Sequence, residues 1–120
     1  MAKIMIVDDE SNLRTLYKLE IEAMGHNVVS IDNGREAVKA VYQTDPDLIV
    51  LDLNMPQGDG IDFLNWLMCN HMGIPVIIYS AYSHYKNDFM TWGAESYLIK
   101  SSDLTELKNE IERLLDSITT

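Results

Sequence analysis

Short apolar runs alternate along this chain with segments of helical periodicity. The runs hold three to five residues and are rich in Ile, Val and Leu, so they are too short for helices and typical of strands buried on both faces of a sheet. They lie at Ile4–Val7, Asn27–Ile31, Leu48–Leu51, Val76–Tyr79 and Tyr97–Ile99. The alternation predicts a doubly wound α/β fold, in which a five-stranded parallel sheet is covered by helices on both faces.

Each apolar run is followed by a segment whose apolar residues recur at three- and four-residue intervals. The first segment includes Leu16 among its inward residues and stops at Gly25, a typical helix terminator. The other helices are expected around Ala37–Val41, Ile61–Met68, Ser83–Trp92 and Leu104–Ile118. Asp103 and Glu106 form a candidate capping box at the start of the last helix.

Length and composition narrow the class of protein. The chain has 120 residues, of which 47% are hydrophobic, which fits one domain over residues 1–120. Its formal net charge of −10 disfavours direct nucleic-acid binding and favours basic partners or bound cations. The lone Cys69 cannot form an internal disulfide, and no apolar run approaches the length of a membrane span. We therefore expect a soluble cytoplasmic domain without a membrane partner.

Polar residues follow four of the five predicted strands. The acidic pair Asp8-Asp9 follows the first strand, Asp52 the third, Ser80 the fourth and Lys100 the fifth. Right-handed crossovers place the carboxyl ends of all parallel strands at one edge of the sheet, where ligands of such folds bind. We expect these side chains to form a site at that edge.

The predicted site has the groups that phosphoryl transfer requires. Three carboxylates on neighbouring strands repel one another and are suited to hold Mg²⁺, with Mn²⁺ as an alternative ion. Lys100 supplies a compact positive charge and Ser80 a hydroxyl donor. Phosphoryl transfer depends mainly on positioning and charge neutralisation. Asp52 is therefore the natural nucleophile, and its product is an acyl phosphate.

These residues resemble the receiver domain of two-component response regulators over almost the whole chain. The matching positions are Asp8-Asp9, Asp52, Asn54-Met55-Pro56, Gly60, Ser80-Ala81, Tyr97 and Lys100. The resemblance implies a flavodoxin-like (βα)5 fold with strand order 2-1-3-4-5. It also implies Mg²⁺ bound by Asp9, Asp52 and the Asn54 carbonyl, with Asp8 acting through water, and a phosphoryl contact at Ala81.

The resemblance further implies a signalling role. Asp52 would accept a phosphoryl group from a histidine kinase or a phosphotransfer protein, and the chain would catalyse only its own phosphorylation and dephosphorylation. Ser80 would then move toward the phosphate and Tyr97 into the vacated space. The surface of the fourth helix, fifth strand and fifth helix would change for a downstream protein, and the chain would stand alone unless an output domain has been removed.

Two positions depart from the family pattern. Ser101 follows Lys100 where the family usually has a proline on a cis bond, and a cis bond without proline costs about 3 kcal/mol, so we expect a trans bond here. Gly58 stands where the family more often has a larger apolar residue, which would loosen the loop.

Other readings stay open. A phosphatase-type hydrolase also uses an aspartate at a strand end, but it needs a second acid two residues later, where this chain has Asn54. A degenerate receiver that binds partners without phosphorylation is a further alternative. Tyr97 is equally well explained as core, and His26, His71 and His84 lack ligand spacing and are expected on the surface.

Overall fold

The computed structural model describes residues 1–56, 59–70, 73–82 and 93–119. Its strands are β1 (Lys3–Val7), β2 (Asn27–Ile31), β3 (Leu48–Leu51), β4 (Val76–Ser80) and β5 (Ser96–Ile99). Its described helices are α1 (Ser11–Glu22), α2 (Gly34–Thr44), α3 (Asp59–Asn70) and α5 (Thr105–Thr119). The fourth helix expected at Ser83–Trp92 lies outside the described residues, as do His71 and His84.

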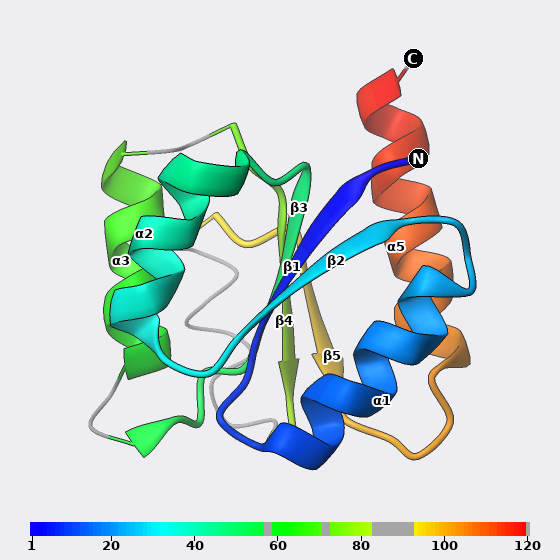
Figure 1. Ribbon diagram of the computed structural model, residues 1–120, viewed down its shortest axis with the longest axis horizontal. Helices are drawn as coiled ribbons and strands as arrows, with labels where there is room; N and C mark the ends of the chain where they lie inside the picture. The colour runs from blue at the N-terminus through cyan, green and yellow to red at the C-terminus, as the bar shows by residue number, and fades with distance from the viewer. Residues whose placement is uncertain (57–58, 71–72, 83–92, 120) are drawn as a thin grey trace.

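The strands form one parallel sheet in the order β2-β1-β3-β4-β5. This confirms the predicted fold class and strand order. The chain crosses from β1 outward to β2, returns past β1 to β3 and continues to β4 and β5 (Figure 1). The two central strands β1 and β3 therefore lie side by side, and their carboxyl ends carry Asp8 and Asp52.

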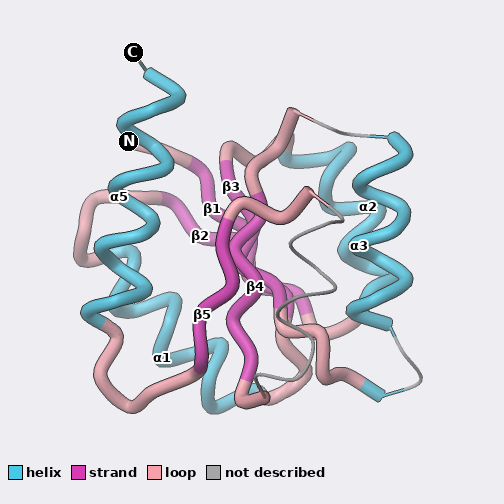
Figure 2. The backbone as a smooth tube through the Cα atoms, turned by 180° about the vertical axis from the view of Figure 1, so that it is seen from behind, coloured by secondary structure: helices cyan, strands magenta, loops and turns pink. Residues whose placement is uncertain are grey.

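Helices cover both faces of the sheet. Helices α1 and α5 lie on one face and α2 and α3 on the other, as Figure 2 shows from behind. Alternate strand residues point to opposite faces, so Ile4 and Ile6 pack toward α1 and α5, whereas Met5 and Val7 pack toward α2 and α3. Two apolar layers thus hold β1 and β3 rigidly from both sides.

Three local expectations are corrected by the structure. Leu16 is 39% exposed, because α1 turns its face with Tyr17 and Ile21 inward. The capping box is wrong: the Asp103 carboxylate accepts hydrogen bonds from the amide and hydroxyl of Thr105, two residues later. His26 is largely enclosed, since its ring accepts a hydrogen bond from the Ala2 amide and contacts the Glu112 carboxylate.

Two other expectations on the path of the chain are confirmed. Gly25 ends the first helical segment with a φ of 98°, a conformation that side chains other than glycine rarely adopt. The Lys100–Ser101 peptide bond is trans, since the described residues contain no cis bond. Within the described ranges, no helix combines the length and apolar character needed to cross a membrane.

Candidate functional site

The backbone of the site is an extension of the sheet. The Asp8 amide donates to the Ile31 carbonyl at 3.1 Å, and the Asp52 amide donates to the Val7 carbonyl at 2.9 Å. In the same way the Lys100 amide donates to the Ser80 carbonyl at 2.7 Å. Each of these residues lies one position beyond its strand yet keeps the ladder hydrogen bond. Their Cα positions are therefore fixed by the sheet rather than by a loop.

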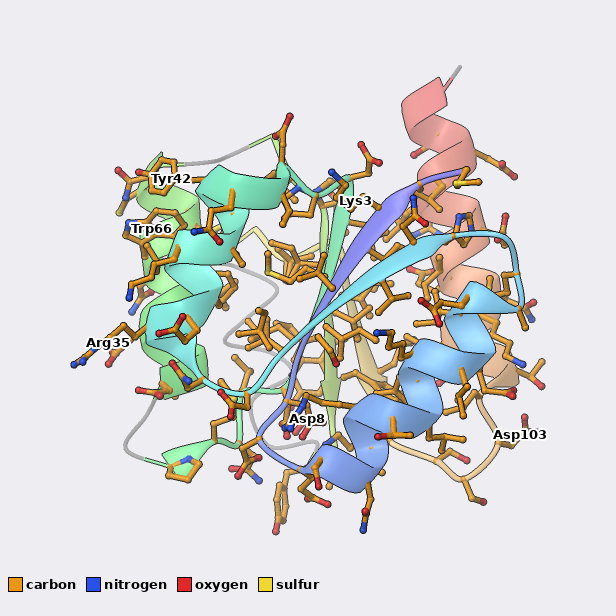
Figure 3. The ribbon with its side chains drawn as sticks, viewed as in Figure 1. Lys3, Asp8, Arg35, Tyr42, Trp66 and Asp103 are labelled. Atoms are coloured by element: carbon orange, nitrogen blue, oxygen red, sulfur yellow. The ribbon has the colours of Figure 1, made fainter. Side chains whose placement is uncertain are left out.

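Three carboxylates meet at this edge. Asp8, Asp9 and Asp52 each offer an oxygen, and these oxygens lie within 4.8 Å of one another. Asp8 and Asp52 are only 2% and 4% exposed, whereas Asp9 faces solvent. Figure 3 shows Asp8 at the end of the sheet opposite to Lys3, where the carboxyl ends of the strands gather. The predicted clustering of the three acids is thus present.

Lys100 connects two of these acids. Its Nζ lies 2.8 Å from Oδ2 of Asp8 and 2.9 Å from Oδ2 of Asp52, and its side chain is 13% exposed. Burial disfavours the ammonium charge, but the hydrogen bonds to both carboxylates outweigh this, and the pKa of Lys100 lies above its ordinary value. Lys100 is therefore a permanent positive charge beside the candidate nucleophile.

The electrostatic balance at Asp52 is different. Burial raises the pKa of the Asp52 carboxyl, and the opposing effects of the Asn54 amide and of Lys100 only partly compensate. A buried carboxylate gains from a further cation, because opposite charge favours its ionised form. Hard carboxylate oxygens with one exposed member are a donor set that suits Mg²⁺. The residues present therefore fit a magnesium ion.

The second oxygen of each buried acid is held by its own loop. Oδ1 of Asp8 accepts from the Glu10 amide, and Oδ1 of Asp52 accepts from the Asn54 amide, both at 2.9 Å. Such bonds from a side chain to the amide two residues later are typical turns of aspartate. They orient each carboxylate so that its Oδ2 faces Lys100.

Sequence reasoning missed one residue that supports this edge from α1. Nη1 of Arg14 donates to the Asp8 carbonyl at 2.8 Å. An arginine one turn into a helix that follows an acidic pair is a weak signal, because many such residues only face solvent. Its partner became evident only once α1 had been placed against β1.

The predicted switch residues lie along β4 and β5. Ser80 is fully buried at the end of β4, where its Oγ accepts from the Tyr82 amide at 3.2 Å, and Ala81 after it is exposed. Tyr97 on β5 is 6% exposed, packs in the apolar layer of α2 and α3, and donates its hydroxyl hydrogen to the Tyr82 carbonyl. Both residues are inside the fold, and their roles as switches stay predictions.

The fold and this cluster agree with the comparison to known proteins. The chain belongs to the response regulator receiver domain family, whose model matches residues 4–112, and this family serves two-component signalling. Its sequence is 33% identical to the regulatory protein AtoC of Escherichia coli K12 over 94% of the chain. It is 30% identical to the alkaline phosphatase synthesis transcriptional regulatory protein PhoP of Bacillus subtilis 168, again over 94% of the chain.

A solved structure supports the same family. The chain is similar to the response regulator TrrA of Thermotoga maritima, crystallised in complex with Mg²⁺-BeF, with 35% identity and a TM-score of 0.88. This match covers 95% of the chain and 99% of TrrA. TrrA has also been solved in complex with the histidine kinase ThkA, where the identity is 36%, the TM-score is 0.87, and the match covers 96% of the chain and 99% of TrrA. By contrast, the chain spans only 25% of AtoC and 48% of PhoP.

Proposed function

We propose that this receiver domain accepts a phosphoryl group on Asp52 in a Mg²⁺-dependent reaction. The observation that carries the proposal is the arrangement around Asp52. A buried carboxylate at the end of a central strand has Lys100 2.9 Å away and the Asp8 and Asp9 carboxylates beside it. The proposal treats residues 1–120 as one receiver unit.

The proposed chemistry needs no proton transfer at the nucleophile. An oxygen of the Asp52 carboxylate attacks the phosphorus atom of a phosphohistidine or of a small acyl phosphate. A new O–P bond forms while the bond from phosphorus to the donor nitrogen or oxygen breaks, and the leaving group takes the electron pair. Lys100, already within hydrogen-bond distance of Asp52, offers its ammonium to the oxygens of the transferred phosphoryl group.

The residues that would hold the ion are Asp9, Asp52 and the Asn54 carbonyl, with Asp8 acting through water. When bound, Mg²⁺ supplies positive charge that offsets the charge of the transferred group and of the acids. The TrrA structure with Mg²⁺-BeF supports this assignment, since that protein shares 35% of its sequence with the chain. In this proposal Ala81, which is exposed beside Ser80, contacts the phosphoryl group through its backbone.

The experiment that tests the proposal uses the purified chain with acetyl phosphate. In the presence of MgCl₂, intact-mass spectrometry is expected to show one added phosphoryl group per chain, and none when EDTA is present. Peptide mapping should place the group on Asp52. Multiple additions, or full labelling in EDTA, would contradict the proposal. Steady release of phosphate over many turnovers would instead support a hydrolase.

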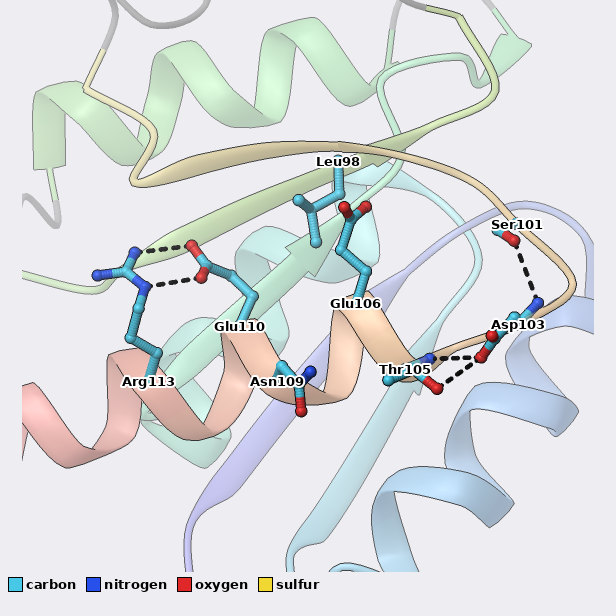
Figure 4. A pocket seen from close by; sticks show the side chains of 8 residues that line it. All are labelled: Leu98, Ser101, Asp103, Thr105, Glu106, Asn109, Glu110 and Arg113. Atoms are coloured by element: carbon cyan, nitrogen blue, oxygen red, sulfur yellow. Dashed lines mark hydrogen bonds and ion pairs between the residues drawn. The ribbon is translucent and has the colours of Figure 1, made fainter.

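The downstream side of the proposal is a change of surface. Phosphorylation would draw Ser80 toward the phosphoryl group and let Tyr97 move, so that the surface of the fourth helix, β5 and α5 binds a protein partner. The described half of this surface includes a groove of about 750 Å³ between β5 and α5. Figure 4 shows Leu98 above the groove, with Glu106 and Glu110 pointing from α5 toward β5.

The upstream and whole-protein roles are inferred from relatives. The complex of TrrA with a histidine kinase supports a kinase or phosphotransfer protein as the phosphoryl donor. AtoC and PhoP carry regulatory names, and the chain matches only part of each, so a regulatory output is part of the proposal for any longer protein. The domain itself is proposed not to contact nucleic acid, because its net charge is −10. We place this signalling role in the cytoplasm.

Magnesium is expected to stabilise the folded chain through Asp9. An ion that binds only the folded state at ten times its dissociation constant adds about 1.4 kcal/mol to the free energy of unfolding. Asp9→Ala should remove most of this increase while changing the stability without Mg²⁺ little, because Asp9 is exposed. Thermal denaturation with and without MgCl₂ measures both quantities.

The matched control for this experiment is Glu22→Ala, which removes another exposed acid at the far end of α1. Glu22→Ala should keep the full Mg²⁺-dependent increase. If Asp9→Ala and Glu22→Ala retain the same increase as the wild type, the ion binds elsewhere and the assignment of Asp9 fails.

A further inference from the structure

The position of Lys100 depends on a segment with little support of its own. β5 ends at Ile99, and the last ladder hydrogen bond in this region comes from the Lys100 amide. Residues 101–103 after it are exposed and irregular. A lysine side chain has many rotamers, so two short contacts to Asp8 and Asp52 require that its backbone be held on both sides.

A buried tyrosine contacts the backbone on the unsupported side. The Tyr79 hydroxyl accepts from the Ser101 amide at 3.3 Å and lies 3.4 Å from the Ser101 carbonyl, to which it donates. Both contacts go to the residue that directly follows Lys100. They connect β4 with the end of β5 in addition to the pairing of the two strands.

The Tyr79 ring is itself held in place. Tyr79 is 2% exposed, and its ring packs edge-on against Tyr17 of α1, with ring centroids 5.6 Å apart and planes inclined by 65°. Arg14 of the same helix holds the Asp8 carbonyl. The hydroxyl therefore projects from a fixed ring, and it has one donor and one acceptor position to match the amide and carbonyl of Ser101.

We propose that Tyr79 is a positioning residue for Lys100: its hydroxyl fixes the Ser101 backbone and so directs the Lys100 ammonium between Asp8 and Asp52. The inference rests on the proposed function, in which that ammonium meets the phosphoryl group. Both hydrogen bonds are long for their type, so their contribution to global stability is small. Their effect is on the placement of Lys100, where small displacements reduce the rate of a reaction strongly.

The test is a double-mutant cycle between Tyr79→Phe and Lys100→Ala. Tyr79→Phe keeps the ring and removes the hydroxyl. It is expected to slow phosphorylation by acetyl phosphate about three- to tenfold, the equivalent of one or two lost hydrogen bonds. In the Lys100→Ala background the same change is expected to have no further effect. Mg²⁺ affinity, which depends on acids of β1 and β3, should stay within about twofold of the wild type.

A spectroscopic readout follows Lys100 without any phosphorylation. In NMR spectra of lysine-labelled protein, the side-chain signal of Lys100 is identified by its absence in Lys100→Ala. Tyr79→Phe should move this signal toward the position of exposed lysines and leave the dispersion of the remaining spectrum unchanged. Tyr17→Phe is the control, because it removes an equally buried phenol from the other ring of the pair. It should leave the Lys100 signal in place.

The outcomes separate this inference from the proposed function. If the wild type is not labelled at all, the proposed function fails, and the NMR signal still decides the positioning role. If the wild type is labelled but Tyr79→Phe slows labelling equally in both backgrounds, Tyr79 acts on general structure and the positioning role is wrong. An unshifted Lys100 signal in Tyr79→Phe overturns the inference as well.

Discussion

Asp52→Asn is expected to abolish phosphorylation by acetyl phosphate. The amide is similar in size and can still accept the Asn54 amide hydrogen bond that Asp52 accepts at 2.9 Å. It is not a nucleophile at neutral pH, and it lowers the negative charge of the metal cluster. The fold should remain intact while the added phosphoryl group disappears from the intact-mass spectrum.

The control for Asp52→Asn lies on the same strand. Asp47 precedes β3, and its carboxylate accepts from the Lys3 amide at 2.8 Å, at the opposite end of the sheet. Asp47→Asn makes the same chemical change away from the site, so full labelling is expected. Labelling of Asp52→Asn at wild-type stoichiometry would show that another residue is the acceptor.

The same variant has a consequence for stability that depends on pH. Burial raises the pKa of Asp52, so its ionised form is disfavoured by the fold. The wild type should therefore lose stability relative to Asp52→Asn as pH rises through the range in which aspartate ionises, around pH 4. Urea denaturation in EDTA below and above this range measures the difference, and a difference of opposite sign would contradict the electrostatic account.

The strands and the site edge could be predicted from the sequence because both follow from local patterns. Runs such as Leu48–Leu51 are buried on both faces and need no partner to be recognised. Once the sheet is parallel, the residue after each strand must lie at one edge. The meeting of Asp8, Asp52 and Lys100 follows from chain topology alone.

The contacts that refine the site could not be predicted in this way. Tyr79 reaches Ser101 across 22 positions of sequence, and its pattern indicates only a buried aromatic residue. Leu16 has the spacing of an inward residue but lies at the margin of the buried face of α1. His26 is enclosed by groups from the N-terminus and from α5. Each outcome depends on how two distant elements pack, and no local pattern carries that information.

Gly60 is a further case in which packing decides, and it gives a second large prediction. A Cβ atom at this position would lie 2.5 Å from the Asp52 carbonyl oxygen, 2.7 Å from the Leu53 Cα and 2.9 Å from the Leu53 carbonyl oxygen. All three atoms belong to the backbone, which cannot move aside as a flexible side chain can. The start of α3 therefore approaches the phosphoacceptor strand closely only because residue 60 is glycine.

Gly60→Ala is expected to disturb stability and the site together. Forcing a methyl group into such a contact typically costs about 1–3 kcal/mol of unfolding free energy. The backbone of Asp52 must shift to relieve it, so Mg²⁺ affinity and the rate of labelling should fall even at temperatures where the variant is folded. Gly73→Ala is the matched control, since a Cβ there meets no atom within 4 Å and its φ is not positive. If Gly60→Ala lost stability but kept wild-type Mg²⁺ affinity, the site would be shown to tolerate movement of the Asp52 backbone, contrary to the rigid edge inferred from the sheet.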